Sequence, residues 1–386
     1  MADTLAPHDF AAFFRAVWGF DPFPWQERLL LDLATEAGPH GWPQVLDLPT
    51  GAGKTAALDI AVFHLALDAD ERQARRAPVR IAFVVDRRLI VDDAYERAKH
   101  LCRALRWSLL HDREAQTETE KIAVEHPRLT AAFSSVRAES AVKRVAVALR
   151  RLAGDDQPPL IARALRGGAP REDDWADTPV QPTILCSTVD QVGSRLLFRG
   201  YGVSDRMKPV HAGLLGSDCL ILLDEAHLSN PFRQTLTAIE RLRRPDDAPF
   251  GFAVLTATPT VNAGPLFALS AQDEAHPVLS ARIAASRPAR LVEIAGKGGH
   301  RIAASGRHRR RGDGRAYGVA KPHCQSCRRR RAQPCCAGTG RVRASARRIG
   351  GGSRSHTRHR SSARGRSRQA CRKARVHTDR PRRFAQ

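Results

Sequence analysis

The stretch LDLPTGAGKT, residues 46–55, constrains the fold more than any other feature of the chain. We predict a short apolar strand at 45–48 before it and a helix from Thr55 to about Asp68 after it. The glycines allow backbone N–H groups to curl around an anion, and the positive end of the helix dipole adds to the attraction. A strand, a loop of this kind and a helix in succession are typical of a phosphate-binding unit in an α/β domain.

The residues of this loop have expected roles if a nucleotide binds there. Lys54 would reach the β- and γ-phosphates, and Thr55 would place its hydroxyl group on Mg²⁺. The residues just before them would form the backbone cradle, and these are Thr50, Gly51, Ala52 and Gly53. The strict phosphate-loop pattern has Gly where this chain has Leu48. The alternative is a glycine-rich turn that binds nothing.

A second motif, LILLDEAHL at residues 220–228, places two acidic side chains at the end of a predicted buried strand. Ligands of open α/β sheets bind at the carboxyl ends of the strands. Asp224 would therefore hold Mg²⁺ through water, and Glu225 would orient and deprotonate an attacking water molecule. The alternative is an Asp-Glu pair that only caps the helix that follows.

A third motif, VLTATP at residues 254–259, ends another predicted strand with the hydroxyl groups of Thr256 and Thr258. These groups could bond to the acidic cluster and transmit the state of a bound nucleotide. Threonine is ordinary at a strand end, so the functional interpretation depends on the position of this motif after DEAH.

Strands alternate with helices along the first 300 residues, which predicts an α/β domain with a mostly parallel sheet covered by helices on both faces. Besides the strand before the loop, strands are expected at 79–85, 183–186, 219–223, 252–256 and 291–294. Residues 106–178 lack strand signals, and we interpret them as an insertion. Its one expected amphipathic helix contains Val142, Val145, Leu149 and Leu152.

The motifs PTGAGKT, DEAH and TATP, in this order, resemble the first RecA-like domain of superfamily-2 nucleic-acid helicases. Three further stretches are FDPFPWQERLL at 20–30, CSTVDQVGSRLLFRGYG at 186–202 and DEAHLSNPF at 224–232. They look like the CRISPR-associated helicase–nuclease of type I interference systems. That family unwinds and degrades invading DNA after an RNA-guided complex has opened it. The resemblance extends over residues 20–295 and implies ATP and Mg²⁺ as cofactors.

The resemblance also implies particular contacts. Gln26 matches the glutamine that reads adenine, and His227 matches a residue that couples the nucleotide site to nucleic acid. The residues implied to contact single-stranded DNA are Arg87, Arg88, Thr188, Asp190 and Gln191. Several of these also have a plainer alternative as the first residues of predicted helices, and His227 could instead cap a strand end. The RNA-guided type I surveillance complex is the implied protein partner.

The composition changes abruptly near residue 300. Residues 301–386 hold 27 Lys and Arg, 2 acidic residues and no Leu, which gives them a net charge of +25, whereas the preceding residues carry −2. A segment of this composition cannot bury enough apolar surface to fold. Residues 299–386 are therefore expected to be a disordered basic tail. They contain no arginine-finger motif of a second motor domain, and we hypothesise that they are a frameshift product.

If the tail is genuine, it would bind nucleic acid through phosphate charge. The chain would then be a nucleotide-dependent binding module without motor activity, and a restriction-type DNA translocase subunit is a further alternative. Cys324, Cys327 and their neighbours could suggest a zinc site, but their spacing fits no standard one.

The expected organisation has three parts. Residues 1–40 form a helical segment with the adenine-reading motif, 41–298 form the RecA-like ATP-binding domain, and 299–386 form the tail. The N-terminus lacks the pattern of a signal peptide, and no run reaches the roughly 18 apolar residues of a membrane span. The cysteines before the tail have no metal-like spacing, which suits a reducing compartment. We therefore expect a cytoplasmic protein without a membrane partner.

Overall fold

The computed structural model describes residues 4–35, 41–70, 75–125, 129–167, 173–225, 229–244, 247–257, 266–285, 289–294 and 301–306. The α-helices in this part of the chain are α1 Phe10–Trp18, α2 Pro24–Thr35, α3 Ala57–Leu67, α4 Arg88–Ser108, α5 Asp112–Glu125, α6 Thr130–Ala138, α7 Ser140–Ala153, α8 Val189–Leu196, α9 Met207–Gly216, α10 Asn230–Leu242, α11 Ala271–Ala275 and α12 Pro277–Ile283. The strands are β1 Val45–Asp47, β2 Arg80–Val85, β3 Ile161–Leu165, β4 Thr183–Thr188, β5 Cys219–Asp224, β6 Phe250–Thr256, β7 Leu266–Ala268, β8 Ala289–Ile294 and β9 Arg301–Gly306.

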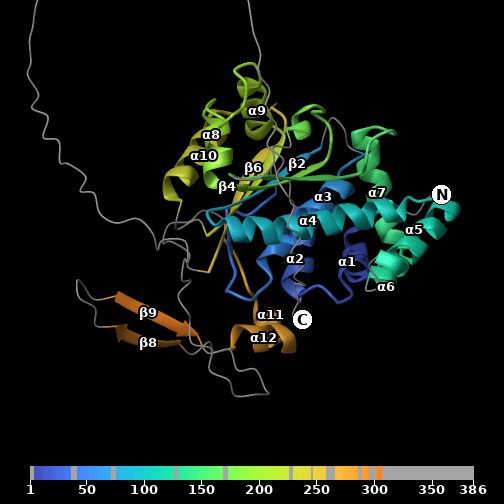
Figure 1. Ribbon diagram of the computed structural model, residues 1–386, viewed down its shortest axis with the longest axis horizontal. Helices are drawn as coiled ribbons and strands as arrows, with labels where there is room; N and C mark the ends of the chain where they lie inside the picture. The colour runs from blue at the N-terminus through green and yellow to red at the C-terminus, as the bar shows by residue number, and fades with distance from the viewer. Residues whose placement is uncertain are drawn as a thin grey trace, which may run out of the picture. The chain divides into compact units, whose positions relative to one another are not determined.

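Seven of the described strands form one sheet in the order β3-β4-β2-β5-β6-β1-β7, and every pair in it is parallel (Figure 1). Parallel neighbours need crossover connections, and in a sheet of this kind helices cover both faces. The central strands β2 and β4 are buried along their whole length. The predicted α/β domain is thereby confirmed, and its arrangement is consistent with a RecA-like fold.

The two faces of the sheet carry separate hydrophobic clusters, because successive side chains of a strand point to opposite sides. In β2, Ile81 and Phe83 belong to the first cluster, and Ala82 and Val84 belong to the second. Helices α1 to α7 contribute to the first cluster, whereas α8, α9 and α10 contribute to the second. Figure 1 shows α8, α9 and α10 gathered on one side of the sheet.

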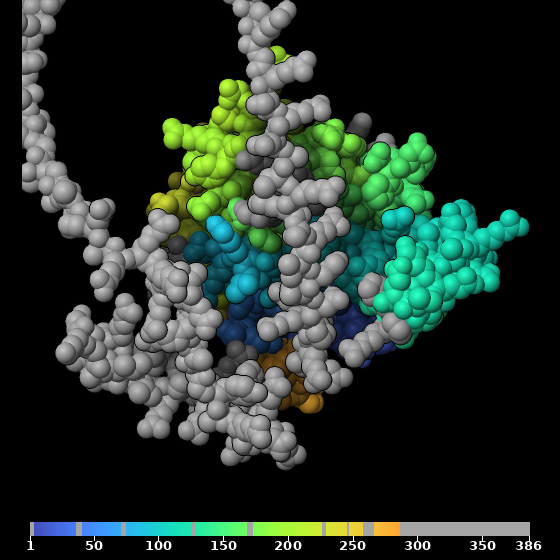
Figure 2. Space-filling view, in the orientation of Figure 1, coloured from blue at the N-terminus to red at the C-terminus, as the bar shows by residue number. Residues whose placement is uncertain are grey.

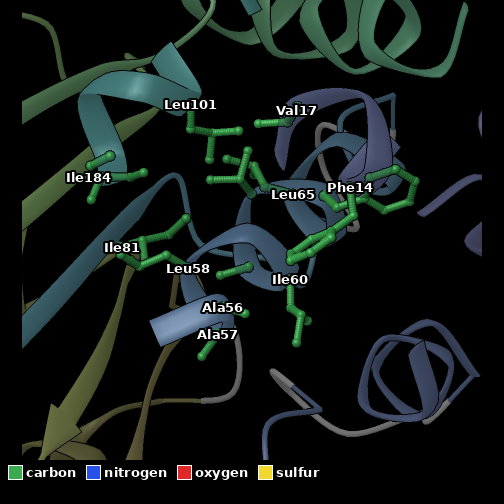
Figure 3. Packing of buried hydrophobic residues seen from close by; sticks show 14 of the residues in the cluster. Phe14, Val17, Ala56, Ala57, Leu58, Ile60, Leu65, Ile81, Leu101 and Ile184 are labelled. Atoms are coloured by element: carbon green, nitrogen blue, oxygen red, sulfur yellow. The ribbon is translucent and has the colours of Figure 1, made fainter. Parts of the chain in front are cut away.

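Helix α3, which begins just after the glycine loop, is buried from Ala57 to Ala66. Figure 3 shows its Leu58 and Leu65 between Ile81 and Ile184 of the sheet on one side and Phe14 of α1 on the other. Full burial of one such leucine contributes about 2 kcal/mol. This packing holds the helix that follows the loop, and therefore the loop itself, at the end of β1.

Two strands of the sheet were not predicted. β3 lies within residues 106–178, where the absence of strand signals proved misleading, and β7 is a second addition. The β3 sequence IARAL is rich in alanine and arginine, which have little strand propensity, so its pairing with β4 determines its conformation. The same segment contains α5, α6 and α7 instead of one helix.

Strands β8 and β9 pair with each other in antiparallel register, apart from the main sheet. β9 falls within the segment for which we predicted disorder, and residues 307–386 lie outside the described part of the chain. In the described residues, every helix is too short or too polar to cross a bilayer.

Candidate functional site

The three sequence motifs meet at one edge of the sheet. All strands of a parallel sheet run in one direction, so their carboxyl ends share an edge. The glycine loop follows β1, Thr256 ends β6 and Asp224 ends β5. Because β6 lies between β1 and β5, the loop strand and the acidic strand are about 10 Å apart at the usual strand spacing. The loop and the carboxylates thus face the same small volume.

The glycine loop has the backbone of an anion cradle. Gly51 and Gly53 adopt left-handed conformations, with φ of 94° and 78°. Such angles strain residues that carry a side chain. A Cβ atom on Gly53 would lie 3.4 Å from Nε2 of Gln26, and one on Gly51 would lie 3.4 Å from the carbonyl oxygen of Arg282. The walls of the cradle therefore come from α2 and α12.

Helix α2 supports the loop from beneath. The ring N–H of fully buried Trp25 donates a hydrogen bond to the Ala52 carbonyl at 3.0 Å. Gln26 is 2% exposed, and its Oε1 accepts a hydrogen bond from the Phe23 N–H at 3.0 Å. Its amide nitrogen is turned toward Gly53. Gln26, the residue predicted to read adenine, therefore lies against the glycine loop.

Lys54 and Thr55 lie where the loop turns into a helix. Residues Lys54–Ala56 form a single 3-10 turn ahead of α3. The Lys54 ammonium donates a hydrogen bond to the Leu48 carbonyl at 3.2 Å, so it points back into its own loop. Both side chains are half-buried. A phosphate bound in the cradle would compete with that carbonyl for the ammonium group.

Asp224 and Glu225 are adjacent at the end of β5. The Glu225 N–H donates to the Leu255 carbonyl and to Oδ1 of Asp224, both at 3.1 Å. Burial raises the pKa of Asp224 above its ordinary value, attraction to Lys54 opposes this shift, and repulsion from Glu225 adds to it. The loop lysine and the strand-end carboxylate therefore interact electrostatically, and a cation between the two acids would relieve their repulsion.

Glu225 also has a strained backbone. Its φ is 56°, a left-handed value that costs a residue with a Cβ atom on the order of 1 kcal/mol. Strain of this kind is concentrated at sites where function requires a particular side-chain direction.

The residues of the site suit Mg²⁺ bound together with a phosphate. The Thr55 hydroxyl and the Asp224 carboxylate supply hard oxygen ligands. Among the described residues, no group of three or more His, Cys, Asp or Glu side chains could hold a metal by itself. Mg²⁺ is commonly held by one or two carboxylates plus phosphate oxygens. A metal ion here would therefore depend on a nucleotide for its remaining ligands.

The arginine pair predicted to contact nucleic acid is at the same edge. Arg87 precedes α4 and Arg88 begins it, and both side chains are exposed. The Arg88 guanidinium approaches the turn after β3, where Nη2 lies 3.3 Å from the position that a Cβ on Gly167 would take. Both arginines are thus accessible at the edge that also carries the nucleotide motifs.

The residues after β4 have mixed environments. Thr188 ends the strand and is buried, whereas Asp190 is exposed in the first turn of α8. Gln191 accepts a hydrogen bond at its Oε1 from Nη1 of Arg195 at 2.6 Å. The Gln191 side chain therefore already has a partner within its own helix, as the structural alternative for this residue requires.

Two residues assigned to coupling, His227 and Thr258, lie outside the described residues. The third, Thr256, is buried at the end of β6, where its carbonyl accepts a hydrogen bond from the Leu48 N–H at 2.9 Å. The strand of the third motif is therefore bonded directly to the start of the glycine loop.

A clamp that was not predicted from the sequence joins α2 to α11. Arg28 donates hydrogen bonds to the Ala268 carbonyl at 2.7 Å and to buried Asp273 at 2.8 Å, and its guanidinium lies 4.1 Å from the ring centroid of Phe267. Ser270 and Asp273 form a capping box at the start of α11. The Ser-x-x-Asp pattern was the available signal, but it indicates a helix start and not its partner.

Helix α12 covers Phe23 beside the loop. The rings of Phe23 and His276 lie 5.5 Å apart in an edge-on arrangement, and the Arg282 guanidinium lies 5.3 Å from the Phe23 centroid. A cavity of about 600 Å³ opens next to this helix and reaches the loop at Pro49. The loop therefore borders an open space large enough for a small ligand.

No protein-family model matches this sequence, and a comparison with curated proteins finds no significant match.

Proposed function

We propose that this chain binds Mg²⁺–ATP at the carboxyl edge of its sheet and hydrolyses it as the first motor domain of a DNA helicase. The carrying observation is the strand order β5-β6-β1, which puts the glycine loop and the Asp224–Glu225 pair on one edge with a single strand between them. The interaction of Lys54 with Asp224 supports the same assignment.

The proposed chemistry divides among few residues. The loop backbone and Lys54 would hold the phosphates, and buried Gln26 would support the loop at Gly53. Thr55 and Asp224 would hold Mg²⁺, which would neutralise charge on the phosphate oxygens. Glu225 would orient a water molecule and accept its proton as the oxygen attacks the γ-phosphorus, while the bond to the β–γ bridging oxygen breaks and ADP leaves.

Turnover by this chain alone should be slow. Arginine fingers stabilise the charge that develops on the transferred phosphoryl group, and each contributes on the order of a thousandfold or more. The sequence after residue 300 contains no such motif. We therefore expect ATP binding with very little hydrolysis.

The binding proposal is tested with Lys54→Ala and Lys99→Ala. Lys99 lies along α4, where it pairs with Glu96, so its removal controls for the loss of one positive charge. Anisotropy of a fluorescent ATP analogue with Mg²⁺ should show affinity weakened about tenfold or more for Lys54→Ala, because a charge-assisted contact is lost. Equal affinity of Lys54→Ala and the parent chain would contradict the proposal.

The wider role that we propose is a cytoplasmic helicase component of CRISPR type I defence, acting on single-stranded DNA with an RNA-guided complex. It derives from the sequence motifs and their resemblance. Translation of the neighbouring reading frame beyond the codon for residue 300 should reveal a second RecA-like domain. Without one there, the frameshift hypothesis fails.

The net charge of +25 in residues 301–386 favours a second candidate, a nucleotide-dependent nucleic-acid-binding module without motor activity. That candidate predicts salt-sensitive duplex binding that disappears when these residues are removed. The first candidate predicts that nucleotide affinity survives the same deletion.

A further inference from the structure

A group of exposed apolar side chains follows α8 in a segment that none of the nucleotide motifs includes. Leu197, Phe198 and Tyr201 are 58%, 60% and 61% exposed. Gly200, which lies between them, is buried, and Val203 just after them is 8% exposed. The yellow-green atoms of this region lie on the surface in Figure 2. Clustered apolar side chains on a surface mark interaction sites, and we call this group the 197–201 patch.

Phe198 occupies a position that normally needs glycine. Its N–H donates to the Arg195 carbonyl at 3.0 Å, and the Arg199 N–H donates to the Ser194 carbonyl at 2.7 Å. These two bonds make a Schellman motif at the end of α8, with Phe198 in the left-handed position at φ 58°. Glycine would hold this conformation without strain. An exposed ring adds little packing to the fold, so the strain suggests a role for the ring outside it.

Positively charged residues flank the rings along the chain. Arg199 and Arg206 are exposed, while Lys208 pairs with Asp205 at 2.7 Å. Helix α8 begins directly after Thr188 at the carboxyl edge and has 8 residues, so the patch lies about 12 Å along the helix from that edge. Arg87 and Arg88 are exposed at the same edge. A polyanion held by these arginines would thus need to extend only a short way to reach the rings.

We propose that Phe198 and Tyr201 are a stacking platform for unpaired bases, with Arg199 and Arg206 contacting the phosphates of the same strand. Aromatic faces flanked by arginines bind single-stranded nucleic acid with little sequence preference. Bases in a duplex are stacked on each other and cannot cover the rings, so the platform would select single strands. The assignment of DNA as the strand rests on the function proposed above, whereas base stacking itself needs no ATP.

The charge that flanks the rings along the chain favours a nucleic acid over a protein as the occupant. Leu197 would suit either partner, but two exposed arginines in the same short segment as two exposed aromatic rings match a chain that alternates phosphates and bases. If the patch bound a protein instead, its side chains would not stack on the bases of an added oligonucleotide, and the fluorescence of a base analogue in that oligonucleotide would not change.

The test uses the full chain and a short oligothymidylate that carries one 2-aminopurine, whose fluorescence falls when it stacks. Salt of about 0.3 M weakens the phosphate contacts of the basic tail. We expect quenching and binding with the parent chain, and an affinity loss of about fivefold to a hundredfold with Phe198→Gly. A strand of the same length with abasic sites has the same phosphates, and its affinity should not change on substitution.

Phe198→Gly is suited to this test because it should not harm the fold. Glycine relieves the left-handed strain, so its thermal unfolding midpoint should equal or exceed that of the parent. Tyr201→Ser should also reduce quenching, whereas Leu242→Ser, which removes an 84% exposed side chain from α10, should not. Unchanged quenching and affinity in Phe198→Gly would overturn the proposal and leave a protein-binding surface as the interpretation.

The stacking test and the ATP-binding test can fail independently of each other. Phe198→Gly should bind the fluorescent ATP analogue as the parent does, and Lys54→Ala should retain 2-aminopurine quenching. If Lys54→Ala bound the ATP analogue as tightly as the parent while 2-aminopurine quenching was still observed, only the nucleotide proposal would be contradicted. Failure of the stacking test with intact nucleotide binding would remove the platform alone.

Discussion

The two ends of the main sheet use their charged residues in different ways. At the amino end, Asp218 accepts hydrogen bonds from Arg75 at 2.9 and 2.7 Å and from the Val79 N–H at 2.9 Å. Buried Arg80 donates to the carbonyl groups of Asp218 and Pro179. These charges are joined to one another and to the backbone, so their role is accounted for by the stability of the fold.

At the carboxyl end, charged groups from several segments of the chain converge on one edge. Asp224 and Glu225 repel each other, Lys54 bonds to a carbonyl of its own loop, and Arg87 and Arg88 are exposed. One sheet thus has an end where the charges are bonded to one another and to the backbone, and an end where two neighbouring acids repel each other and two arginines are exposed. The number of charged residues therefore does not locate a binding site. What distinguishes the two ends is how each charged side chain is paired with its neighbours.

The largest expected effect is the loss of Asp218. Asp218→Ala removes the carboxylate that pairs with Arg75 and accepts from the Val79 N–H, and it should lower the free energy of unfolding by about 3 kcal/mol. Urea unfolding followed by circular dichroism would measure it. Asp218→Asn should lose less, since asparagine keeps an acceptor for Val79 and tolerates the φ of 53° at this position.

The counterpart at the carboxyl end is Asp224→Asn. Because burial disfavours the ionised carboxylate, this substitution should leave the free energy of unfolding unchanged or higher while weakening Mg²⁺-dependent nucleotide binding. Equal destabilisation by Asp218→Ala and Asp224→Asn would break the contrast between the two ends.

The next effect is a pH dependence that originates in α3. His64 is 2% exposed, and within the described residues neither ring nitrogen has a hydrogen-bond partner. The pKa of His64 is lowered to about 4, mainly by burial. Attraction to Asp68 raises this pKa, and repulsion from Arg76 lowers it further. Between pH 6.5 and 4, His64 is therefore protonated in the unfolded chain but neutral in the folded protein.

Stability should accordingly be complete above about pH 6.5 and fall as the pH drops toward about 4, by about 3 kcal/mol in total. Urea midpoints between about pH 7 and 4.5 would follow this loss. His64→Leu removes the group, so the part of the slope due to this residue should vanish. A parent and a variant with identical pH profiles would show that His64 does not titrate as its burial demands.

The smallest effect compares two glycines with nearly the same backbone. Gly53 in the loop has φ 78°, and Gly19 at the end of α1 has φ 79°, where an added Cβ atom would meet none of the described residues within 4 Å. Substitution by alanine should cost each about 1 kcal/mol of stability through the left-handed backbone. Gly53→Ala should in addition weaken binding of the ATP analogue, while Gly19→Ala should not. Equal nucleotide affinity in both variants would contradict the cradle.

The elements that could be predicted from the sequence are those whose structure depends on neighbours in the chain. The strand expected at 79–85 became β2, and the helical segment expected over residues 1–40 contains α1, in which Phe10, Phe13, Phe14 and Val17 are buried. β3 was missed because its residues favour no strand and β4 supplies its pairing. The Arg28–Asp273 clamp was missed because its partners lie 245 positions apart.

The candidate site likewise has parts that could be predicted from the sequence and parts that could not. Its loop, its two acidic residues and its exposed arginines could be located by motif, since each motif is a contiguous stretch with its own chemistry. The support given by Trp25, the wall given by α12 and the strained backbones of Glu225 and Phe198 had no sequence signal. They arise from packing between segments that are distant in the chain.

The sequence by itself determined that a glycine loop joins a strand to a helix, that two carboxylates end another strand and that the composition changes near residue 300. These are properties of short stretches, set by side-chain type and spacing. Only the tertiary structure decided that β6 would lie between β1 and β5, and so brought the loop and the carboxylates to one edge. Strand order depends on which hydrophobic faces pack together across the whole chain, and no local stretch contains that information.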